Sequence, residues 1–409
     1  MTIKVIHTSD WHLGKKLFKR PRIEEQALFL NWLEEYIKIE SINILLISGD
    51  IFDTPTPPNE ALALYFNFLN RISENKHFDT VIISGNHDSA SFIEAPASFL
   101  NKHNIHIRTK IYPNIEDNII TIKNETRNIE IKTLPYFRSY DLFNSIQPDS
   151  AELSQVEIKD FLNSFVDTWI TRDNKATPYR IIMAHHAFGE FSATGSEHTL
   201  HLAGLDSLST DWPSDSFDYM ALGHIHSTQK IDKNKNIYYS GAPIPLRFSE
   251  RQKKNIIQIN ITKENEVIEK IEIPTFRNIS QVSGNKNNII EKLKKEIKEL
   301  ELKVTAQSIK LKTYFEIILN LDEPDNHFID NIIELVKDSK GELLSLVPIY
   351  KSNNDYDDGQ FSNKNINDLG IKEIFQDYYK IKHPESTSIP KHIESHFHSI
   401  LEDINHEDS

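Results

Sequence analysis

Five short clusters of aspartate, histidine and asparagine contain the side chains of this 409-residue sequence that could do chemistry. Each cluster follows a run of apolar residues of strand length, and three begin with glycine, which lets the backbone turn tightly or approach a ligand. The clusters are Asp10-Trp11-His12, Gly49-Asp50-Ile51-Phe52-Asp53, Gly85-Asn86-His87-Asp88, His185-His186 and Gly223-His224-Ile225-His226. These residue types bind metals and move protons, so the clusters predict a metal-dependent site.

The mixture of ligand types indicates which metals would bind. Imidazole nitrogens combined with carboxylate and amide oxygens favour Mn²⁺, Fe²⁺, Zn²⁺ or Co²⁺, whereas an all-oxygen site favours Mg²⁺ or Ca²⁺. The clusters offer seven candidate ligands when one of the adjacent histidines His185 and His186 is counted. They suit two divalent ions about 3.5–4 Å apart that share a carboxylate, for which Asp50 is the candidate. Two such ions lower the pKa of a bound water and neutralise phosphate oxygens, so we predict phosphoester hydrolysis.

The segments before the clusters must bring them to one place. Runs rich in Ile, Val, Leu, Met and Tyr occupy residues 3–7, 42–48, 80–84, 179–184 and 218–222. Continuous apolar runs of this length are typical of strands buried on both faces. Between the first two runs, apolar residues recur at helical spacing from Ile23 to Ile37. Alternating strands and helices predict an α/β layered fold, in which residues past the carboxyl ends of strands converge on one crevice.

The character of the sequence changes after Phe276. We predict a domain at 1–276 that contains the clusters, a small α+β domain at 277–350, a linker at 351–370 and a helical tail at 371–409. Residues 351–409 contain six lysines against twelve acidic residues. A short acidic tail has too little apolar surface to fold alone, so we expect it to dock on a partner protein.

Composition excludes several classes of protein. The chain has no cysteine, which excludes disulfides, thiolate metal sites and iron–sulfur clusters. Its formal net charge of −14 argues against a surface coated with nucleic-acid-binding charge. Five cations between Lys15 and Arg22 follow His12 directly, and they suit phosphate contacts and a solvated loop equally well. No apolar run is long enough to span a membrane and the first residues lead into a strand, so we expect a cytoplasmic protein.

The motifs DxH, GDxxD, GNHD, a lone strand-end histidine and GHxH occur in that order, and together they resemble the calcineurin-like metallophosphoesterase superfamily. Within it, the segments HTSDWHLG, ISGDIFD, ISGNHDS, DYMALGHIH and YYSGAPIPLRFSE are similar to the SbcD family of nuclease subunits. The resemblance is sharpest up to about Arg251. It implies a two-sheet α/β sandwich with a dinuclear site, a small capping domain and a helical C-terminal tail.

The resemblance also implies roles for the site residues. The metal ligands would be Asp10, His12, Asp50 and His226 for the first ion and Asp50, Asn86, His185 and His224 for the second. His87 would be the catalytic imidazole beside the scissile phosphate, with Asp88 next to it as an orienting partner.

Two assignments stay open. His185 and His186 are adjacent, and neighbours in a strand point to opposite faces, so only one of them can reach the metals. The family pattern favours His185, with His186 as the alternative. Asp53 occupies the last GDxxD position, where some relatives have histidine, and its role would be to seat a DNA strand.

The resemblance implies a Mn²⁺-dependent DNA nuclease that acts as a 3′–5′ exonuclease on duplex ends, cuts single strands and opens hairpins in replication, recombination and repair. Mg²⁺ or another transition metal would also suit the ligands. The implied partners are DNA and an SbcC-like ATPase, in a heterotetramer that contains a homodimer of this chain. The sequence has no GxxxxGK[ST] loop, so the ATP site would lie on the partner. The alternatives are a phosphatase or cyclic-nucleotide phosphodiesterase of the same superfamily, or a non-catalytic scaffold for the ATPase.

Overall fold

A computed structural model describes most of the chain. The described residues are 2–112, 114–138, 142, 155–170, 178–192, 207–212, 216–250, 252–307, 311–339, 341–350, 375, 379, 389, 390 and 393. The chain divides into two compact units, Met1–Lys351 and Ser352–Ser409. Apart from five single positions, the predicted linker and helical tail lie outside the described residues. Within the described ranges, no helix is both long enough and apolar enough to cross a lipid bilayer.

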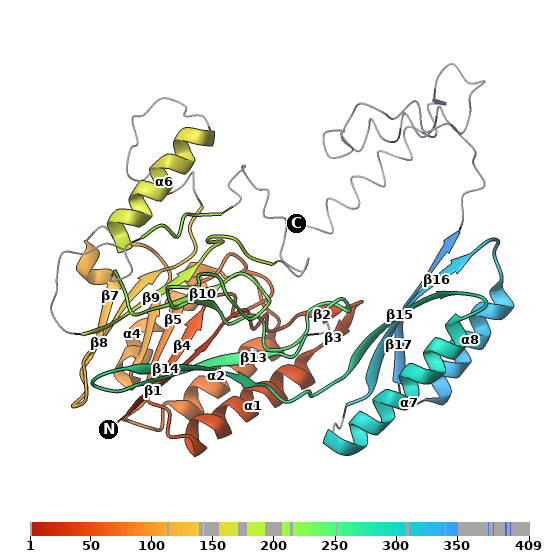
Figure 1. Ribbon diagram of the computed structural model, residues 1–409, viewed down its shortest axis with the longest axis horizontal. Coiled ribbons are helices and arrows are strands. Elements are labelled where there is room, and N and C mark those ends of the chain that lie inside the picture. The colour runs from red at the N-terminus through yellow and green to blue at the C-terminus, as the bar shows by residue number, and fades with distance from the viewer. Residues whose placement is uncertain are drawn as a thin grey trace. The chain divides into compact units, whose positions relative to one another are not determined.

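The first sheet has six strands (Figure 1), and three of the five clusters directly follow strands of this sheet. Its strand order is β14 (Glu266–Glu272), β13 (Asn255–Ile261), β1 (Ile3–Thr8), β4 (Ile44–Ser48), β5 (Asp79–Ile83) and β6 (Ile105–Arg108). Strands β1, β4, β5 and β6 run parallel, so their carboxyl ends share one edge. Every residue of β4 is buried, which explains why its sequence is continuously apolar rather than alternating.

The second sheet carries the other two clusters. Its strand order is β11 (Gln229–Lys230), β12 (Ile237–Tyr239), β10 (Tyr219–Gly223), β9 (Tyr179–His185), β8 (Ile129–Leu134) and β7 (Ile119–Ile122). Strands β8, β9, β10 and β12 run parallel. Strands β9 and β10 each extend one residue further than the apolar pattern predicted, and they end at His185 and Gly223 inside the clusters.

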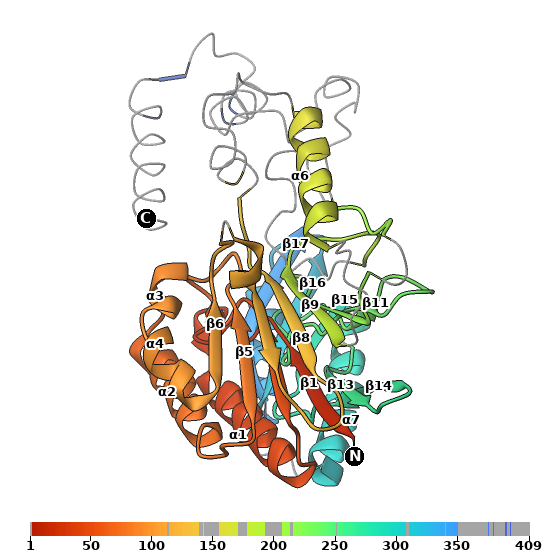
Figure 2. The same ribbon diagram turned by 90° about the vertical axis from the view of Figure 1, so that its left-hand side faces the viewer.

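The two sheets pack face to face, and helices line the outer side of the first sheet (Figure 2). Helices α1 (Ile23–Ile39) and α2 (Asn59–Ile72) pack on the first sheet, and α6 (Gln155–Ile170) packs on the second. The connections contain α3 (Ala90–Glu94), α4 (Ala97–Leu100), η1 (Asn101–His103) and η2 (Ile115–Asn118). This arrangement confirms the predicted α/β two-sheet sandwich, because residues of the apolar runs are buried alternately between the two sheets and beneath the helices.

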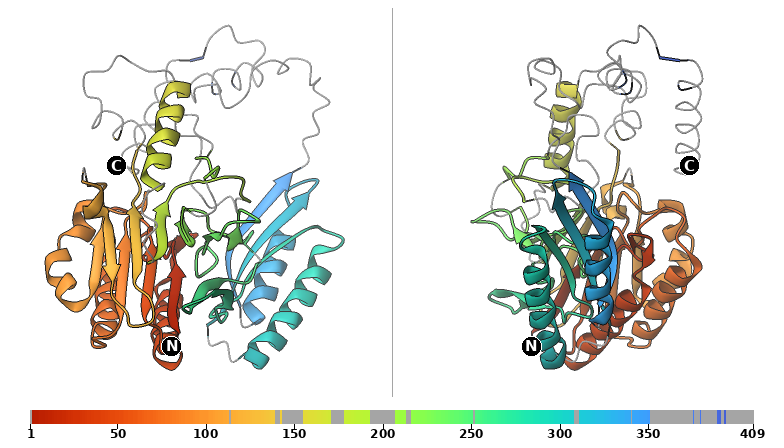
Figure 3. Two further views of the ribbon diagram at one scale, coloured as in Figure 1. Left: turned by 60° about the vertical axis from the view of Figure 1, so that its left-hand side comes forward. Right: turned by 90° about the vertical axis from the view of Figure 1, so that its right-hand side faces the viewer.

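Residues 279–350 form a three-stranded module with a core of its own. Strands β15 (Ile279–Asn285), β16 (Thr313–Leu321) and β17 (Gly341–Tyr350) run parallel, with β16 in the centre. Helices α7 (Ile289–Gln307) and α8 (Asn326–Asp338) pack against this sheet (Figure 3). The predicted domain boundary between residues 276 and 277 falls between β14 and β15. It stays a prediction, because the chain up to Lys351 forms one compact unit.

Candidate metal centre

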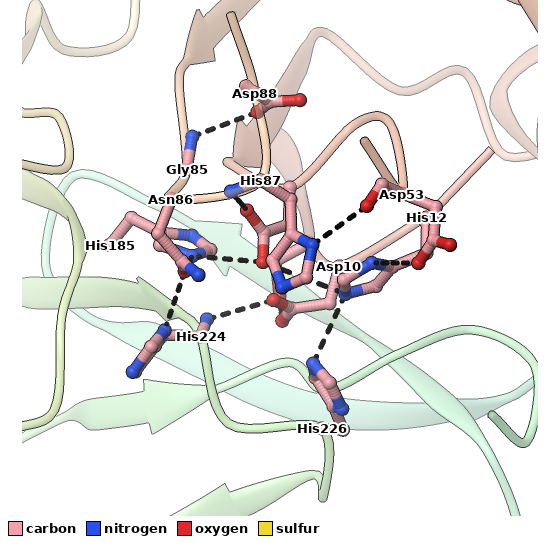
Figure 4. Close-up of polar contacts among 12 residues, drawn as sticks. Asp10, His12, Asp53, Gly85, Asn86, His87, Asp88, His185, His224 and His226 are labelled. Carbon is pink, nitrogen blue, oxygen red and sulfur yellow. Dashed lines mark hydrogen bonds and ion pairs between the residues drawn. The ribbon is translucent and has the colours of Figure 1, made fainter. Parts of the chain in front are cut away.

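The five clusters meet where the carboxyl ends of the two sheets come together (Figure 4). In that view His185 and His224 lie on one side of the cluster, and His12 and His226 lie on the other. Asp10, His12, Asp50 and His226 offer ligand atoms that all lie within 4.8 Å of one another, and all four side chains are buried. The fold therefore gathers candidate ligands that the sequence spreads from Asp10 to His226.

Acceptor atoms converge on one side of this centre. Nδ1 of His185 lies 2.7 Å from the main-chain oxygen of Ser48, which places the ring proton on Nδ1 and leaves a lone pair on Nε2. That Nε2 atom lies 3.1 Å from Oδ1 of Asn86 and 3.4 Å from Oδ2 of Asp50. Nδ1 of His224 lies 2.9 Å from the same Asn86 oxygen. Such a group of lone pairs needs a cation, or a proton in its place.

Nitrogen and oxygen atoms also converge on the other side of the centre, around His12. Nδ1 of His12 lies 3.2 Å from a carboxylate oxygen of Asp53, which directs Nε2 of His12 into the cluster. This Nε2 atom lies 3.2 Å from Nε2 of His226 and 3.6 Å from Oδ2 of Asp50. The two halves thus meet at Asp50, the carboxylate that the sequence predicted as the bridge between two ions.

Two buried carboxylates, Asp10 and Asp50, favour the binding of cations at this centre. Burial raises the pKa of Asp10 to about 7, although its side chain accepts hydrogen bonds from Ser9 Oγ and from the His224 main-chain nitrogen. Burial also opposes ionisation of Asp50, but the neighbouring His185 holds the pKa of Asp50 well below its usual range. The same contact outweighs burial at His185 and raises its pKa to about 9. A proton on His185 balances charge that a metal ion would balance, so the donor set fits divalent cations.

The backbone under the ligands is held in an uncommon conformation. Asp10, His12, Asp50 and His224 have φ angles of 53°, 44°, 51° and 94°, in the left-handed region that residues other than glycine rarely adopt. Strain of this kind is concentrated at functional sites, where the surrounding structure enforces it. The strained backbone therefore aims these four side chains into the cluster.

Two glycines of the motifs are required by close packing. A Cβ atom at Gly223 would lie 1.9 Å from the Ser48 main-chain oxygen and 2.7 Å from Nδ1 of His185. A Cβ atom at Gly85 would lie 2.1 Å from Oδ1 of Asp50. Any side chain at either position would displace a candidate ligand, which explains the glycines with which these two clusters begin.

The structure separates the adjacent histidines of β9. His185 faces Asp50 and Asn86, whereas His186 lies on the opposite face with its Nε2 atom 3.3 Å from the main-chain nitrogen of Phe137. The His186 ring packs 4.1 Å from the Phe137 ring, measured between centroids. Burial lowers the pKa of His186 well below its usual range. Of the two histidines, His185 is the one in the cluster.

His87 and Asp88 each contact main-chain atoms of the neighbouring loop. Nδ1 of His87 lies 2.8 Å from the main-chain oxygen of Asp53. The Asp88 carboxylate accepts hydrogen bonds from the main-chain nitrogens of Gly85, Ile51 and Phe52 at 2.9, 3.2 and 3.0 Å. Asp88 therefore ties the Asp50 loop to the Asn86 loop, and the Asp53 backbone orients the His87 ring. A catalytic role for His87 and Asp88 stays a prediction.

Sequence reasoning missed two main-chain groups that orient the site. The carbonyl oxygens of Ser48 and Asp53 each contact an Nδ1 atom of a site histidine. Every residue has such an oxygen, so residue type contains no signal for them. Sequence reasoning also gave Ser9 no role, although its hydroxyl donates to Asp10; its position directly before Asp10 was the available signal.

Comparison with known proteins identifies the family. The profile of the family described as calcineurin-like phosphoesterase matches residues 3–228, which is more than half of the chain. The chain belongs to the calcineurin-like phosphoesterases. A second profile, SbcD_C, described as the type 5 capsule protein repressor C-terminal domain, matches residues 275–383 of this calcineurin-like phosphoesterase.

Two curated relatives are similar to this calcineurin-like phosphoesterase over most of its length. They are the SbcD chains of the nuclease SbcCD from Escherichia coli K12 and from Escherichia coli O157:H7. Each is 26% identical over 308 residues, which cover 71% of this chain and 73% of the relative. The resemblance to SbcD within the superfamily is thereby confirmed. A crystal structure of a dimetal phosphatase from Danio rerio matches with a TM-score of 0.38 and 12% identity, covering 66% of this chain and 98% of that one.

Proposed function

We propose that this chain is the nuclease subunit of an SbcCD-like complex and hydrolyses DNA phosphodiester bonds at a two-metal centre. The observation that carries the proposal is a set of imidazole and carboxylate ligands converging on Asp50, in a chain similar to SbcD over 71% of its length. The proposed substrates are duplex ends, hairpins and single strands, with 3′–5′ exonuclease and endonuclease action. The SbcC-like partner would supply ATP hydrolysis, in an assembly that contains two copies of this chain.

The centre suits two Mn²⁺ ions. The proposed ligands are Asp10, His12, Asp50 and His226 for one ion and Asp50, Asn86, His185 and His224 for the other. The burial of Asp50 and its contacts with imidazole nitrogens on both sides support it as the shared ligand. When bound, the two ions would activate water and neutralise the phosphate. Nitrogen donors favour Mn²⁺ or another transition metal over Mg²⁺.

His87 is the proposed proton carrier. Its Nδ1 atom faces the Asp53 main-chain oxygen, which only accepts, so this contact places a proton on Nδ1. Nε2 is then the ring atom that would donate to or accept from the leaving oxygen once the phosphate is seated. The main-chain nitrogen of His87 donates to Oδ1 of Asp50 at 2.9 Å, which fixes the base of the imidazole against the centre. Asp88 would assist by holding the two loops together.

The proposal is tested with purified full-length protein, with and without its ATPase partner and ATP. The substrates are a hairpin-ended DNA duplex, single-stranded DNA, cyclic AMP, a phosphopeptide and bis(p-nitrophenyl) phosphate, each with Mn²⁺ and then with Mg²⁺. We expect DNA cleavage with Mn²⁺, loss of cleavage in Asp50→Asn, and two Mn²⁺ ions per chain by elemental analysis.

Three other outcomes would contradict the proposal. Hydrolysis of the phosphopeptide or cyclic AMP without DNA cleavage would identify a phosphatase or a cyclic-nucleotide phosphodiesterase. Inactivity on every substrate, with the partner present, would identify a scaffold. Activity that Asp50→Asn leaves unchanged would show that the chemistry lies elsewhere.

A further inference from the structure

A buried group of charges joins the three-stranded module to the rest of the compact unit. The Glu25 side chain near the start of α1 accepts from two guanidinium groups, Arg22 at one carboxylate oxygen and Arg277 at the other. Glu25 and Arg22 are 1% exposed and Arg277 is 6% exposed. Charged side chains are seldom buried to this extent unless they are paired. We call Arg22, Glu25 and Arg277 the buried clamp.

Each arginine of the clamp also holds a separate segment. Arg22 donates to the main-chain oxygen of Pro245, which lies between β12 and β13. Arg277 donates to the main-chain oxygen of Lys312 at 2.6 Å, and its guanidinium lies 3.9 Å from the centroid of the Tyr314 ring in β16. Stacking on an aromatic ring while donating several hydrogen bonds is an interaction that arginine makes and lysine does not. The clamp thus fixes the first residues of β16 against α1.

The clamp residue Arg22 directly follows a short hairpin that begins a few residues after the candidate ligand His12. Strands β2 (Lys16–Leu17) and β3 (Arg20–Pro21) follow His12, and the main-chain nitrogen of Arg22 closes the hairpin by donating to the Lys15 oxygen at 3.2 Å. Leu17 of this hairpin is buried against Phe248 and Tyr314. The module therefore packs on a segment whose neighbour in sequence is a candidate metal ligand.

A second ion pair joins the same two parts and provides a comparison. Arg20 lies 2.7 Å from Glu342 of β17, but the two side chains are 60% and 30% exposed. Exposed pairs of this kind contribute little, because water screens the charges and the long side chains lose entropy. Removing one member of a buried pair instead leaves an uncompensated charge out of contact with water. The buried clamp, and not the Arg20–Glu342 pair, should hold the module in position.

We propose that Arg277 is a positioning residue for polymeric substrate: by pairing with Glu25 it fixes the three-stranded module relative to the metal centre, so that a long nucleic acid meets both at once. The inference rests on the proposed nuclease function. A small phosphodiester is short enough to touch the centre alone, whereas DNA extends past the ligands onto neighbouring surfaces. Loss of the clamp should therefore weaken the use of DNA and leave the small ester unaffected.

The test compares Arg277→Gln with Glu342→Gln as a matched control that breaks the exposed Arg20–Glu342 pair, in full-length protein loaded with Mn²⁺. The substrates are the hairpin-ended duplex and bis(p-nitrophenyl) phosphate. We expect Arg277→Gln to raise the KM for DNA about tenfold, with kcat and small-ester hydrolysis within about twofold of wild type. Glu342→Gln should stay within about twofold of wild type on both substrates. Glu25→Gln should match Arg277→Gln, and the double variant should be no worse than either, because the residues act as one unit.

Equal loss of both activities in Arg277→Gln would overturn the inference, because a merely structural residue lowers the folded fraction for every substrate. An unchanged KM for DNA would overturn it as well. If Arg277→Gln shows no cooperative melting, Arg277→Lys replaces it, and a KM for DNA equal to that of wild type then rejects the inference. A wild-type protein that hydrolyses the small ester and not DNA would instead refute the proposed function, and this inference would fall with it.

Discussion

The main-chain oxygen of Asp53 lies 2.8 Å from Nδ1 of His87, so the imidazole takes its orientation from the backbone and not from the Asp53 carboxylate. The carboxylate has other neighbours, with Nδ1 of His12 at 3.2 Å and Nζ of Lys15 at 3.0 Å. One residue therefore supports a candidate metal ligand through its side chain and a candidate catalytic group through its main chain. Variants that change only the side chain can separate the two effects.

Asp53→Asn should weaken metal binding while leaving the His87 ring in place. Loss of a carboxylate behind a ligating histidine typically costs about 10–100-fold in metal affinity. We expect the Mn²⁺ concentration for half-maximal activity to rise by that amount, with kcat at saturating Mn²⁺ within about threefold of wild type. A titration of activity against Mn²⁺ measures both. A large fall in kcat at saturating metal would mean that the carboxylate acts on the substrate.

His87→Ala should lower kcat by about 10²–10⁴-fold without changing the number of bound metal ions, because in the proposed mechanism the ring carries a proton and does not bind a metal. Elemental analysis and the Mn²⁺-supplemented cleavage assay measure the two quantities. His106→Ala is the matched control, since the His106 ring pairs with Asp79 in the first sheet. Loss of a metal ion in His87→Ala would contradict the assignment.

The two adjacent histidines of β9 should respond in opposite ways. His185→Ala removes a ring that faces Asp50 and Asn86, so we expect one bound Mn²⁺ per chain in place of two and no cleavage. His186→Phe keeps an aromatic ring against Phe137 and should retain both ions and most of the activity. Elemental analysis of the two purified variants shows which of the two histidines binds a metal ion. The reverse result would make His186 the ligand.

His7 should make the protein less stable at mildly acidic pH. Burial lowers the pKa of His7 from 6.5 to about 3, and its Nδ1 atom lies 2.9 Å from the Tyr219 hydroxyl. Below pH 6.5 His7 is protonated in the unfolded chain, whereas in the folded chain it stays neutral down to about pH 3. The free energy of unfolding therefore falls as the pH falls through that window, by up to about 1.4 kcal/mol per unit from this group.

The measurement is urea unfolding at pH 6.5, 6.0, 5.5 and 5.0 in EDTA, which removes bound metal from the comparison. His7→Gln can still hydrogen-bond Tyr219 but does not titrate. Its free energy of unfolding should depend less steeply on pH than that of wild type, by up to about 1.4 kcal/mol per unit. If the free energy of unfolding depended on pH equally in the two proteins, His7 would have a similar pKa in the folded and the unfolded chain, which would contradict the prediction.

Much of the fold and the gathering of candidate ligands could be predicted from sequence, because the signals are local. Continuous apolar runs mark strands such as β4, and a polar cluster at the end of a strand in a parallel sheet must lie at one edge. Asp50 was also predicted as the carboxylate that two ions share, and its contacts with His12 and His185 support that prediction. The family pattern favoured His185 over His186, and the structure of β9 shows that His185 is the one that faces Asp50.

Interactions formed by main-chain atoms and distant charges could not be predicted. The carbonyl oxygens of Ser48 and Asp53 orient two site histidines, yet the identity of either residue says nothing of it. The pairing of Glu25 with Arg277 joins positions far apart in the chain, and each looks like an ordinary surface charge in the sequence. Both depend on how the layers pack, which periodicity alone does not determine.

The left-handed backbone at Asp10, His12, Asp50 and His224 has a consequence for protein engineering. Transplanting these side chains into the regular helices or strands of another scaffold would reproduce the chemistry of the donors but not their orientation, since ideal helices and strands have negative φ angles. A successful graft would have to copy the loops, together with the glycines and serines that support them. The smallest transferable unit of this centre is a set of strand-to-loop junctions.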